Sequence, residues 1–541
     1  MSLNFKKFII AVLGIAFLIS LLYVQQMEVA RKAQEAGLTK PHIEIPASSK
    51  RCVECHEKET PGIASHWTGS GHAVKGVGCF ECHEAQEGDV DAFKHEGALI
   101  ATIVTPLDCA KCHETEYEEF AHSHHAKAGR ILASLDNRLA EVAEGNRVPF
   151  APHGMTPGRE GDFNMVNGFG LVNLGCKQCH GSKIALKTID GGVVTLDDLF
   201  LEPGQTGQPT NLEAAARVMK DENGKPMIDH QSWPNTGIGR FNLDGSKGSC
   251  TACHSRHDFS PRRARQPENC GKCHLGPDHP QKEVYEESKH GIAYRDMKDE
   301  LNLDGETWVL GEDYNAAPTC ATCHMSANVN NGGKIHHDVG RRISWNNRPP
   351  ASVVMDTDKD NKVIKTTDVK ERARLLADGG DSWQNKRGRM QDACHNCHSK
   401  DYVNKFYMQY DDLVVLYNQK FAEPGKQLMG LLKTANVRTG AMFDEEIEWT
   451  WFYLWHHEGR RARHGAAMNA PDYTHWHGLY EVAERFYMEL LPQAEEMAHH
   501  AIEHGNPEGG QAILEKIQEI LKRPEHQWFT KTKPDRIFEF D

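Results

Sequence analysis

All 16 cysteines of this 541-residue chain fall in one pentapeptide, C-x-x-C-H, which occurs eight times. In this motif the two thiols add to the vinyl groups of a haem as thioethers, and the histidine becomes the proximal ligand of the iron. The sequence therefore predicts eight covalently attached c-type haems. The copies are Cys52/Cys55/His56, Cys79/Cys82/His83, Cys109/Cys112/His113, Cys176/Cys179/His180, Cys250/Cys253/His254, Cys270/Cys273/His274, Cys320/Cys323/His324 and Cys394/Cys397/His398.

Other uses of paired cysteines explain the pattern less well. A zinc ribbon does not require a histidine directly after its second cysteine. A disulfide framework would leave the eight motif histidines without a role, and a redox-active C-x-x-C pair accounts for one copy rather than eight. We therefore interpret every copy as a haem attachment site.

The N-terminus predicts export from the cytoplasm, which agrees with haem attachment because bacteria carry out that step outside the cytoplasm. Lys6 and Lys7 precede an uncharged apolar run at residues 8–24, the order found in a secretory signal peptide. The run is intermediate between a signal peptide and a membrane span, and no clear A-x-A cleavage site follows it. Residues 1–33 are therefore expected to be a signal peptide, with an N-terminal membrane anchor as the alternative.

Composition and periodicity predict a mainly α protein, with two regions after the N-terminal segment. Residues 34–400 hold all eight motifs and are expected to form a loop-rich cytochrome domain wrapped around its haems. Residues 401–541 are expected to form a C-terminal helical domain without haem, because large apolar residues recur at helical spacing in 402–432, 445–504 and 511–521. Pro424 and Gly425 interrupt the first of these helical segments. The net charge of −14 argues against a nucleic-acid partner.

The sixth ligand of each iron decides whether a haem transfers electrons or reacts. A haem with a histidine on both faces only transfers electrons, whereas an open face can bind a small molecule. Of 32 histidines, eight belong to the motifs, which leaves 24 for the distal faces. The main candidates for distal ligands lie near motifs and are His72, His125, His257, His290, His337 and His395. Further candidates are His122, His124, His230 and His336.

Three strings of sequence resemble a known family. They are Cys270-Gly-Lys-Cys-His-Leu-Gly-Pro-Asp-His-Pro-Gln, then Ser288-Lys-His-Gly, and the seventh motif ending His324-Met325. Together they resemble the multihaem enzymes of the nitrogen cycle, namely the octahaem hydroxylamine oxidoreductases and the pentahaem, ammonia-forming nitrite reductases. Eight motifs favour the octahaem family, and the resemblance extends over nearly the whole chain.

The resemblance implies a catalytic centre at the fourth motif. Cys176, Cys179 and His180 would attach the catalytic haem and supply its proximal ligand, and its distal face would be open. Asp278 and His279 match the family's distal acid–histidine pair. The other seven haems would be electron carriers with two histidines each.

The segment Pro471-Asp-Tyr-Thr-His-Trp-His-Gly resembles the family segment whose tyrosine is crosslinked to the catalytic haem. By this resemblance Tyr473 forms the crosslink, and it does so in a neighbouring subunit of a homotrimer. Two covalent bonds from tyrosine would distort the macrocycle and change its electronic properties. In the family the tyrosine accompanies oxidation. The alternative is a core or interface residue, because Trp476 and Tyr480 lie nearby.

The chemistry of the Asp–His pair suits the implied reaction. Oxidation of hydroxylamine to nitric oxide releases three electrons and three protons, so the site needs a proton acceptor. A histidine with an ordinary pKa of about 6.5 can accept a proton at neutral pH, and Asp278 can share it. The alternative is that Asp278 caps a turn opened by Gly276 and Pro277, with His279 on the surface.

Several functions stay open on the sequence alone. The first is hydroxylamine oxidation, with electrons passed to a cytochrome c type acceptor, which we expect to be basic because this chain is acidic. Oxidation of hydrazine to dinitrogen needs the same residues. A reductive nitrite or hydroxylamine reductase would have the open haem without the crosslink, and an electron-transfer cytochrome would have neither. We expect an extracytoplasmic location, the periplasm or an equivalent bacterial compartment such as an anammoxosome lumen.

Overall fold

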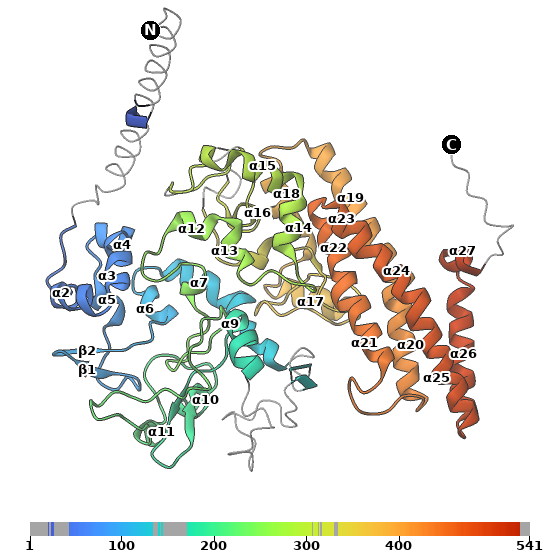
Figure 1. Cartoon of the computed structure of the whole chain (residues 1–541), viewed down its shortest axis with the longest axis horizontal. Coiled ribbons are helices and arrows are strands. Elements are labelled where there is room, and N and C mark those ends of the chain that lie inside the picture. Colours follow the sequence, from blue (N-terminus) through green and yellow to red (C-terminus); the bar gives the residue numbers. More distant parts are fainter. Residues whose placement is uncertain are drawn as a thin grey trace, which may run out of the picture. The chain divides into compact units, whose positions relative to one another are not determined.

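The computed structural model is mainly helical (Figure 1), which confirms the predicted fold class. It describes residues 43–133, 139–140, 142–143 and 170–530, apart from 306, 312, 314, 315 and 329–333, together with residues 20 and 23–25. Most of the predicted export segment lies outside the described residues. Within them, no helix has the length and apolar character needed to cross a membrane.

The chain divides into two compact units. The first comprises residues 1–82 with 256–259, and the second comprises residues 83–255 with 260–541. The expected boundary between residues 400 and 401 falls inside the second unit, so the C-terminal helices belong to the same unit as most of the haem motifs.

The first unit is a small group of helices built around the first motif. Val53, Trp67 and Ala73 form its core, against which Ile43 and Cys79 pack. Trp67 also donates its indole N–H to the carbonyl of Val77 at 3.0 Å. The helices are α2 (Lys50–Glu59), α3 (Pro61–Thr68), α4 (Gly71–Val74) and α5 (Cys79–His83), the last ending at the boundary with the second unit.

The N-terminal half of the second unit is loop-rich, as expected of a chain that surrounds cofactors. A two-residue turn with positive φ at Glu96 and Gly97 closes the β1–β2 hairpin, in which Phe93 faces Ile100. Its elements are β1 (Phe93–His95), β2 (Ala98–Ile100), α6 (Pro106–Ala110), α7 (Glu114–His122), η1 (His125–Ala133), η2 (Val172–Cys176), α9 (Lys177–His180), β3 (Ala185–Lys187), β4 (Val193–Thr195), α10 (Leu196–Leu199), α11 (Leu212–Ala216) and η3 (Cys250–Ala252).

The middle of the second unit consists of short helices that carry the sixth to eighth motifs. Tyr285, Trp308 and Leu303 lie in its apolar core. The elements are α12 (Pro261–Arg265), α13 (Pro267–Gly271), α14 (Gln281–Glu287), α15 (Lys289–Met297), η4 (Lys298–Glu300), α16 (Cys320–Met325), η6 (Val339–Arg342), β5 (Trp345–Asn346), β6 (Val353–Val354), α17 (Val369–Ala377) and α18 (Trp383–Cys394). β3 pairs with β4, and β5 with β6, as antiparallel hairpins.

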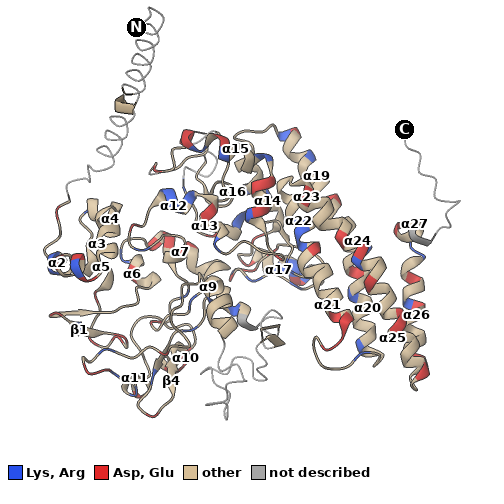
Figure 2. Ribbon diagram, viewed as in Figure 1, with Lys and Arg blue, Asp and Glu red and all other residues tan. Residues whose placement is uncertain are grey.

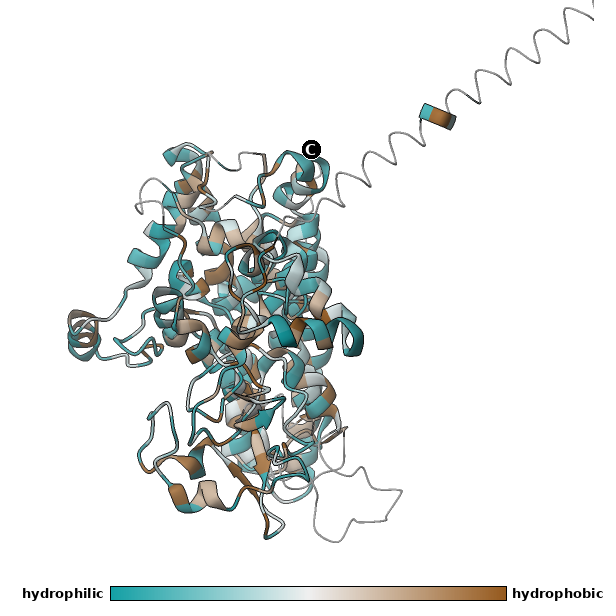
Figure 3. Ribbon diagram, turned by 90° about the vertical axis from the view of Figure 1, so that its left-hand side faces the viewer, coloured by the Kyte–Doolittle hydropathy of each residue, from teal (hydrophilic) through white to brown (hydrophobic). Residues whose placement is uncertain are grey.

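Long helices form the C-terminal part, as the periodicity predicts. Figure 3 shows hydrophobic and hydrophilic residues interspersed along the part of the ribbon that faces the viewer. The C-terminal helices pack around Leu428, Phe452, Phe486, Leu490 and Ile513. Acidic and basic residues are interspersed along the same helices (Figure 2). Their bounds are α19 (Lys400–Tyr417), η7 (Asn418–Ala422), α20 (Glu423–Thr434), α21 (Glu446–Phe452), η8 (Tyr453–Glu458), α22 (Gly459–Met468), α23 (Pro471–Thr474), η9 (His475–Tyr480), α24 (Glu481–Arg485), η10 (Phe486–Leu490), α25 (Leu491–Glu503), α26 (Pro507–Leu521), η11 (Pro524–His526) and α27 (Gln527–Thr530).

The structure corrects one expectation for these helices. Pro424 and Gly425 do not interrupt the first helical segment, because α19 continues through the π turn η7 directly into α20. Proline has no N–H to donate and its ring crowds the preceding turn, and a π turn is one of the ways a helix accommodates such a residue. Further π turns, η8, η9 and η10, occur in the helices that follow.

Candidate haem-binding and catalytic site

The 16 motif cysteines all lie within the described residues, and no two of them form a disulfide. They nevertheless lie close to one another across motifs. In the first unit, Cys52 and Cys79 are near enough to influence each other's charge. In the second unit the thiol contacts are Cys109 with Cys250, Cys179 with Cys273, and Cys270 with Cys320. Cys323 also lies near Cys394, and Cys253 near Cys270.

A thiol that bonds a haem must face the cofactor instead of packing against protein. In the polypeptide alone, Cys55, Cys112 and Cys397 are exposed and the other motif cysteines, Cys82 among them, are half-buried. The motif histidines His56 and His254 are half-buried as well.

These thiol contacts give the motifs of the second unit an order in space that differs from their order in sequence. The third motif meets the fifth, the fifth lies near the sixth, the sixth meets the seventh, and the seventh lies near the eighth. The fourth motif joins this series at the sixth, through Cys179 and Cys273. Cofactors attached to these thiols would therefore form a series with the fourth as a branch.

Proximal histidines are oriented by hydrogen bonds at Nδ1. His83 bonds the carbonyl of Ala101 at 2.9 Å, and His324 bonds the carbonyl of Val339 at 3.1 Å. His274 bonds the side-chain oxygen of Gln281 at 3.2 Å. A partner at Nδ1 fixes the tautomer and leaves Nε2 as the nitrogen available to a metal, which is the usual arrangement of metal-binding histidines.

The first and fifth motifs hold their histidines through local contacts. His56 Nδ1 is hydrogen-bonded to the hydroxyl of Thr60 at 2.7 Å, which restricts the orientation of the ring. The backbone N–H of His254 donates to the carbonyl of Cys250 at 3.0 Å, which closes the fifth motif into a single turn. Such a turn keeps the histidine close to the first thiol, as attachment of one haem by both residues requires.

Two of the predicted distal histidines face proximal ones. The ring centroids of His125 and His274 are 6.0 Å apart, and those of His290 and His398 are also 6.0 Å apart. An iron bonded to one nitrogen of each ring at about 2 Å would hold the rings roughly this far apart. The residues present therefore fit two histidine-ligated haems, at the sixth and eighth motifs.

The other distal candidates have different surroundings. His337 lies near His113 of the third motif, and its Nδ1 is 3.6 Å from a carboxylate oxygen of Glu119. The ring of His72 packs edge-on against Phe259 in the first unit, to which His257 also belongs. For His395, the buried Nδ1 has no hydrogen-bond partner among the described residues.

Close backbone packing positions the fourth motif. Ile238 and Gly239 donate their N–H groups to the carbonyls of Cys179 and His180 at 3.0 and 3.1 Å. Gly181 ends α9 with a φ of +75°, and a Cβ there would lie 2.4 Å from the backbone nitrogen of Arg240. The segment after His180 can therefore approach its neighbour only because it is glycine.

Within the motif, the buried Lys177 fixes the preceding π turn. Its ammonium donates to the side chain of Asn173 and to the carbonyl of Gln231. Burial lowers the pKa of Lys177 to about 8. These bonds hold η2, which carries Cys176, against the loop around residue 231.

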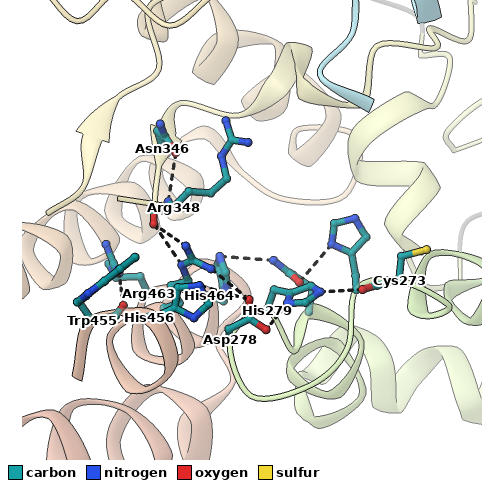
Figure 4. Close-up of polar contacts among 12 residues, drawn as sticks. Cys273, Asp278, His279, Asn346, Arg348, Trp455, His456, Arg463 and His464 are labelled. Atoms are coloured by element: carbon teal, nitrogen blue, oxygen red, sulfur yellow. Dashed lines mark hydrogen bonds and ion pairs between the residues drawn. The ribbon is translucent and has the colours of Figure 1, made fainter. Parts of the chain in front are cut away.

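Asp278 and His279 lie on the loop between α13 and α14, beside Cys273 of the sixth motif (Figure 4). His279 Nδ1 bonds Asp278 Oδ1, and His279 Nε2 bonds the carbonyl of Cys273 at 2.8 Å. Cys273 is also the residue whose thiol contacts Cys179. The structure thus brings the predicted acid–histidine pair and the fourth motif together around Cys273.

The charge state of the pair follows from its partners. Burial opposes ionisation of Asp278, but the bond to His279 and the nearby charges outweigh it and lower its pKa to about 2. Burial likewise opposes protonation of His279, but Asp278 raises its pKa above the ordinary value. Because both ring nitrogens face acceptors, the geometry is that of a carboxylate beside an imidazolium.

One face of the helix η8–α22 lies beside Asp278, and the sequence analysis did not identify its residues as part of the site. Arg460 donates to Asp278 Oδ2 at 3.2 Å, and His456 Nε2 lies 3.9 Å from the same oxygen. His464 Nε2 lies 3.5 Å from the side-chain nitrogen of Gln281. His456, Arg460 and His464 follow one another every fourth residue, and this spacing is the signal that could have found them.

Tyr473 lies in α23, which packs against α22. Its backbone N–H and that of Asp472 donate to the carboxylate of Glu287, at 3.4 and 2.6 Å. Its ring lies near His477, with centroids 6.1 Å apart, and burial followed by Glu283 raises its pKa. The side chain is only partly buried, and Trp476 beside it is 59% exposed.

Two family models of multihaem cytochromes match parts of this chain. The family described as "Seven times multi-haem cytochrome CxxCH" matches residues 242–442, and "Cytochrome c554 and c-prime" matches residues 108–181. The chain is a multihaem c-type cytochrome. This cytochrome is 26% identical over 377 residues to the "Probable nitrite reductase-hydroxylamine oxidoreductase fusion protein" of Kuenenia stuttgartiensis, with 67% of the chain aligned. The aligned part spans only 35% of that relative's length.

Two solved structures share the fold of this multihaem cytochrome. A "Hypothetical multiheme protein" is 26% identical with a TM-score of 0.63, covering 86% of this chain and 99% of the other. The "Kuenenia stuttgartiensis reducing HAO-like protein complex Kustc0457/Kustc0458" is 19% identical with a TM-score of 0.50, covering 83% and 85%. At 19% identity, the second likeness shows a shared fold.

Proposed function

We propose that the protein is an octahaem oxidoreductase that oxidises hydroxylamine to nitric oxide at the fourth motif. The observation that carries the proposal is the meeting at Cys273 of the fourth-motif thiol of Cys179 with His279. A C-x-x-C-H motif placed beside a half-buried acid–histidine pair is the arrangement that the resemblance implies. The name of the Kuenenia stuttgartiensis relative, which includes hydroxylamine oxidoreductase, supports the same substrate class.

The reaction removes three electrons and three protons from hydroxylamine. When bound, the haem of the fourth motif supplies the iron that takes up the substrate and its electrons. Asp278 and His279 accept the protons that the substrate releases. The His279 side chain is 34% exposed, so protons can pass from the pocket to water. The three electrons pass to an acceptor of the cytochrome c type.

Electron transfer away from the site follows the order of the motifs. We propose seven haems with two histidine ligands, to which His125 and His290 contribute at the sixth and eighth motifs. The sixth motif meets the fourth and also lies near the fifth and seventh, so a haem held at the sixth motif would connect the fourth to both arms of the series. The remaining distal ligands would come from His72, His257, His337 and His395, with His124 a further candidate because its buried Nε2 has no hydrogen-bond partner among the described residues.

We further propose that Tyr473 crosslinks to the fourth haem of a neighbouring subunit in a homotrimer. Two observations support this. The contacts of Tyr473 within the described residues come from α14, α22 and η9, and none comes from the fourth motif. The neighbouring side chains of Trp476 and Tyr480 are 59% and 55% exposed, and such exposed aromatic residues are typical of an interface.

A denaturing gel stained for haem tests the proposal. Thioether-bound haem stays on the chain after reduction and boiling, and a tyrosine–haem bond between subunits would survive as well. We expect a haem-stained band at trimer mass, hydroxylamine-dependent reduction of an added cytochrome c, and loss of both in Tyr473→Phe with eight haems retained. A band only at monomer mass in the wild type would refute the crosslink and the oxidative assignment.

A second candidate function is reduction of nitrite or hydroxylamine. The observation in its favour is that both nitrogens of His279 face acceptors, so the imidazolium has a proton to give. Reduction consumes protons and oxidation releases them. Steady-state rates in both directions, with reduced viologen as the electron donor for reduction, distinguish the two functions.

A further inference from the structure

We propose that Arg460 is a positioning residue of the distal pocket, which fixes Asp278 so that one oxygen always faces His279. The proposal rests on the proposed function only in placing the reaction beside Asp278 and His279. The role itself is argued from the contacts of one arginine.

The two oxygens of Asp278 have separate partners. Oδ1 accepts from His279 Nδ1, whereas Oδ2 accepts from Arg460 at 3.2 Å and lies 3.9 Å from His456 Nε2. The Asp278 side chain is 20% exposed. Rotation of this carboxylate would break both hydrogen bonds together. The bond to Arg460 therefore restricts the orientation of the Asp278 carboxylate relative to His279.

Arg460 is itself held rigidly. Its Nε and one terminal nitrogen donate to the carbonyl of Arg348 at 3.2 and 2.8 Å. The guanidinium lies 5.2 Å from the ring centroid of Trp455, and only 13% of the side chain is exposed. A planar guanidinium with several fixed donors can hold a carboxylate in one direction, which a lysine ammonium cannot do.

The carbonyl that holds Arg460 is also fixed. Asn346 accepts a hydrogen bond from the Arg348 N–H at 3.1 Å, as Figure 4 shows. Arg463, three residues after Arg460 on the same helix, donates to Ser352 Oγ at 2.7 Å and to the carbonyl of Pro349 at 3.4 Å. The segment 346–352 is thus attached to α22 at several points, and Arg460 connects it to the loop of Asp278.

His456 does not replace Arg460 in this role. Its nearest nitrogen is 3.9 Å from Asp278 Oδ2, beyond hydrogen-bond distance, and its ring stacks on Phe452 with centroids 4.2 Å apart. His464 faces Gln281 rather than the carboxylate. Among the described residues, Arg460 is the side chain that donates a hydrogen bond to Asp278 Oδ2.

A double-mutant cycle on the haem-loaded protein tests the proposal. The variants are Arg460→Gln, Asp278→Asn and the double variant, with cyanide affinity followed by the Soret band and hydroxylamine oxidation followed in parallel. We expect Arg460→Gln to weaken cyanide binding about tenfold and to lower kcat by about ten- to a hundredfold, with little change in KM. Because Arg460 acts through Asp278, the double variant should lose no more than Asp278→Asn alone.

Two further measurements separate positioning from general stability. Added guanidinium should restore part of the cyanide affinity in Arg460→Ala, because it replaces the missing group. Arg485→Gln is the matched control, since Arg485 also bridges helices and lies 5.4 Å from an aromatic ring, that of Tyr453, but pairs with Glu458 and Glu489. It should leave cyanide affinity within twofold of the wild type.

The outcomes distinguish this inference from the proposed function. Unchanged cyanide affinity in Arg460→Gln, or additive losses in the double variant, would overturn the positioning role. If the cyanide affinities of the variants follow the expected double-mutant cycle but the wild-type protein does not oxidise hydroxylamine, the proposed function is refuted and the role of Arg460 stands.

Discussion

The imidazole rings of His125 and His274 face each other with their centroids 6.0 Å apart. His274 is the proximal histidine of the sixth motif, so the geometry predicts that His125 is its distal ligand. Replacing His125 with alanine should leave the haem content unchanged and convert one low-spin haem to a high-spin, five-coordinate one. Electron paramagnetic resonance of the oxidised protein and carbon monoxide binding to the reduced protein measure this change.

The control for this prediction is His499→Ala. His499 is exposed on α25 and lies 4.0 Å from Glu495, its ion-pair partner. It should have no effect on either spectrum. If His125→Ala also leaves the spin states unchanged, another residue ligates the sixth haem.

The haem motifs and the helices were easier to recognise in the sequence than the surroundings of Asp278. The thiols of each C-x-x-C-H motif lie within five residues, so a local pattern is sufficient to find them. The helices of residues 400–434, 446–468 and 507–521 were likewise visible as a repeating apolar face. Asp278 and His279 were found by resemblance, not from periodicity.

The residues that surround Asp278 could not be predicted in the same way. Arg460 and His456 are distant from Asp278 in sequence, and only the packing of α22 on the 276–281 loop brings them together. Charged residues at every fourth position of a helix usually indicate a solvated face. The order of the motifs in space also depends on tertiary packing, as the contact of Cys179 with Cys273 shows.

The close packing at Gly181 makes a prediction about the fourth haem. An alanine there would have to adopt a φ of +75° and would place its Cβ 2.4 Å from the backbone nitrogen of Arg240. Since the backbone contact cannot be relieved by a side-chain movement, Gly181→Ala should destabilise the protein by more than the roughly 1–2 kcal/mol of a strained φ alone. Haem content measured as pyridine haemochrome should fall by up to one haem per chain.

Gly191→Ala is the matched control for that substitution. Gly191 also has a positive φ, +83°, but a Cβ there meets nothing within 4 Å. It should lower the melting temperature slightly and leave the haem content unchanged. Equal effects of the two substitutions would show that the approach to Arg240 is unimportant.

His526 predicts how stability depends on pH. It is fully buried, its Nδ1 bonds the hydroxyl of Tyr487 at 2.7 Å, and burial lowers its pKa to about 4. In the unfolded chain the pKa is about 6.5. The unfolded state therefore binds more protons between pH 4 and 6.5, so stability is fully present above pH 6.5 and falls as the pH decreases to 4.

Melting temperatures measured from pH 7.5 to 4 test this dependence. His526→Gln should lower the melting temperature at pH 7.5, because it removes the stacking on Phe486, and should flatten the decline below pH 6.5. His504→Gln is the control, since His504 is exposed at the end of α25. An unchanged slope in His526→Gln would mean that other groups cause the acid sensitivity.

Asp278→Asn provides the most direct test of the proton-transfer role. Asparagine keeps the size of the side chain but removes the negative charge that raises the pKa of His279. The rate of hydroxylamine oxidation should fall by roughly 10²–10⁴-fold, the range expected for loss of acid–base assistance. The acidic limb of the remaining activity should move to lower pH, because His279 then loses its proton at a lower pH.

Asp304→Asn is the control for this substitution. It removes an exposed carboxylate paired with Arg262 at 2.9 Å and should change neither the rate nor the pH profile. A full rate with an unshifted acidic limb in Asp278→Asn would show that protons leave the substrate by another route.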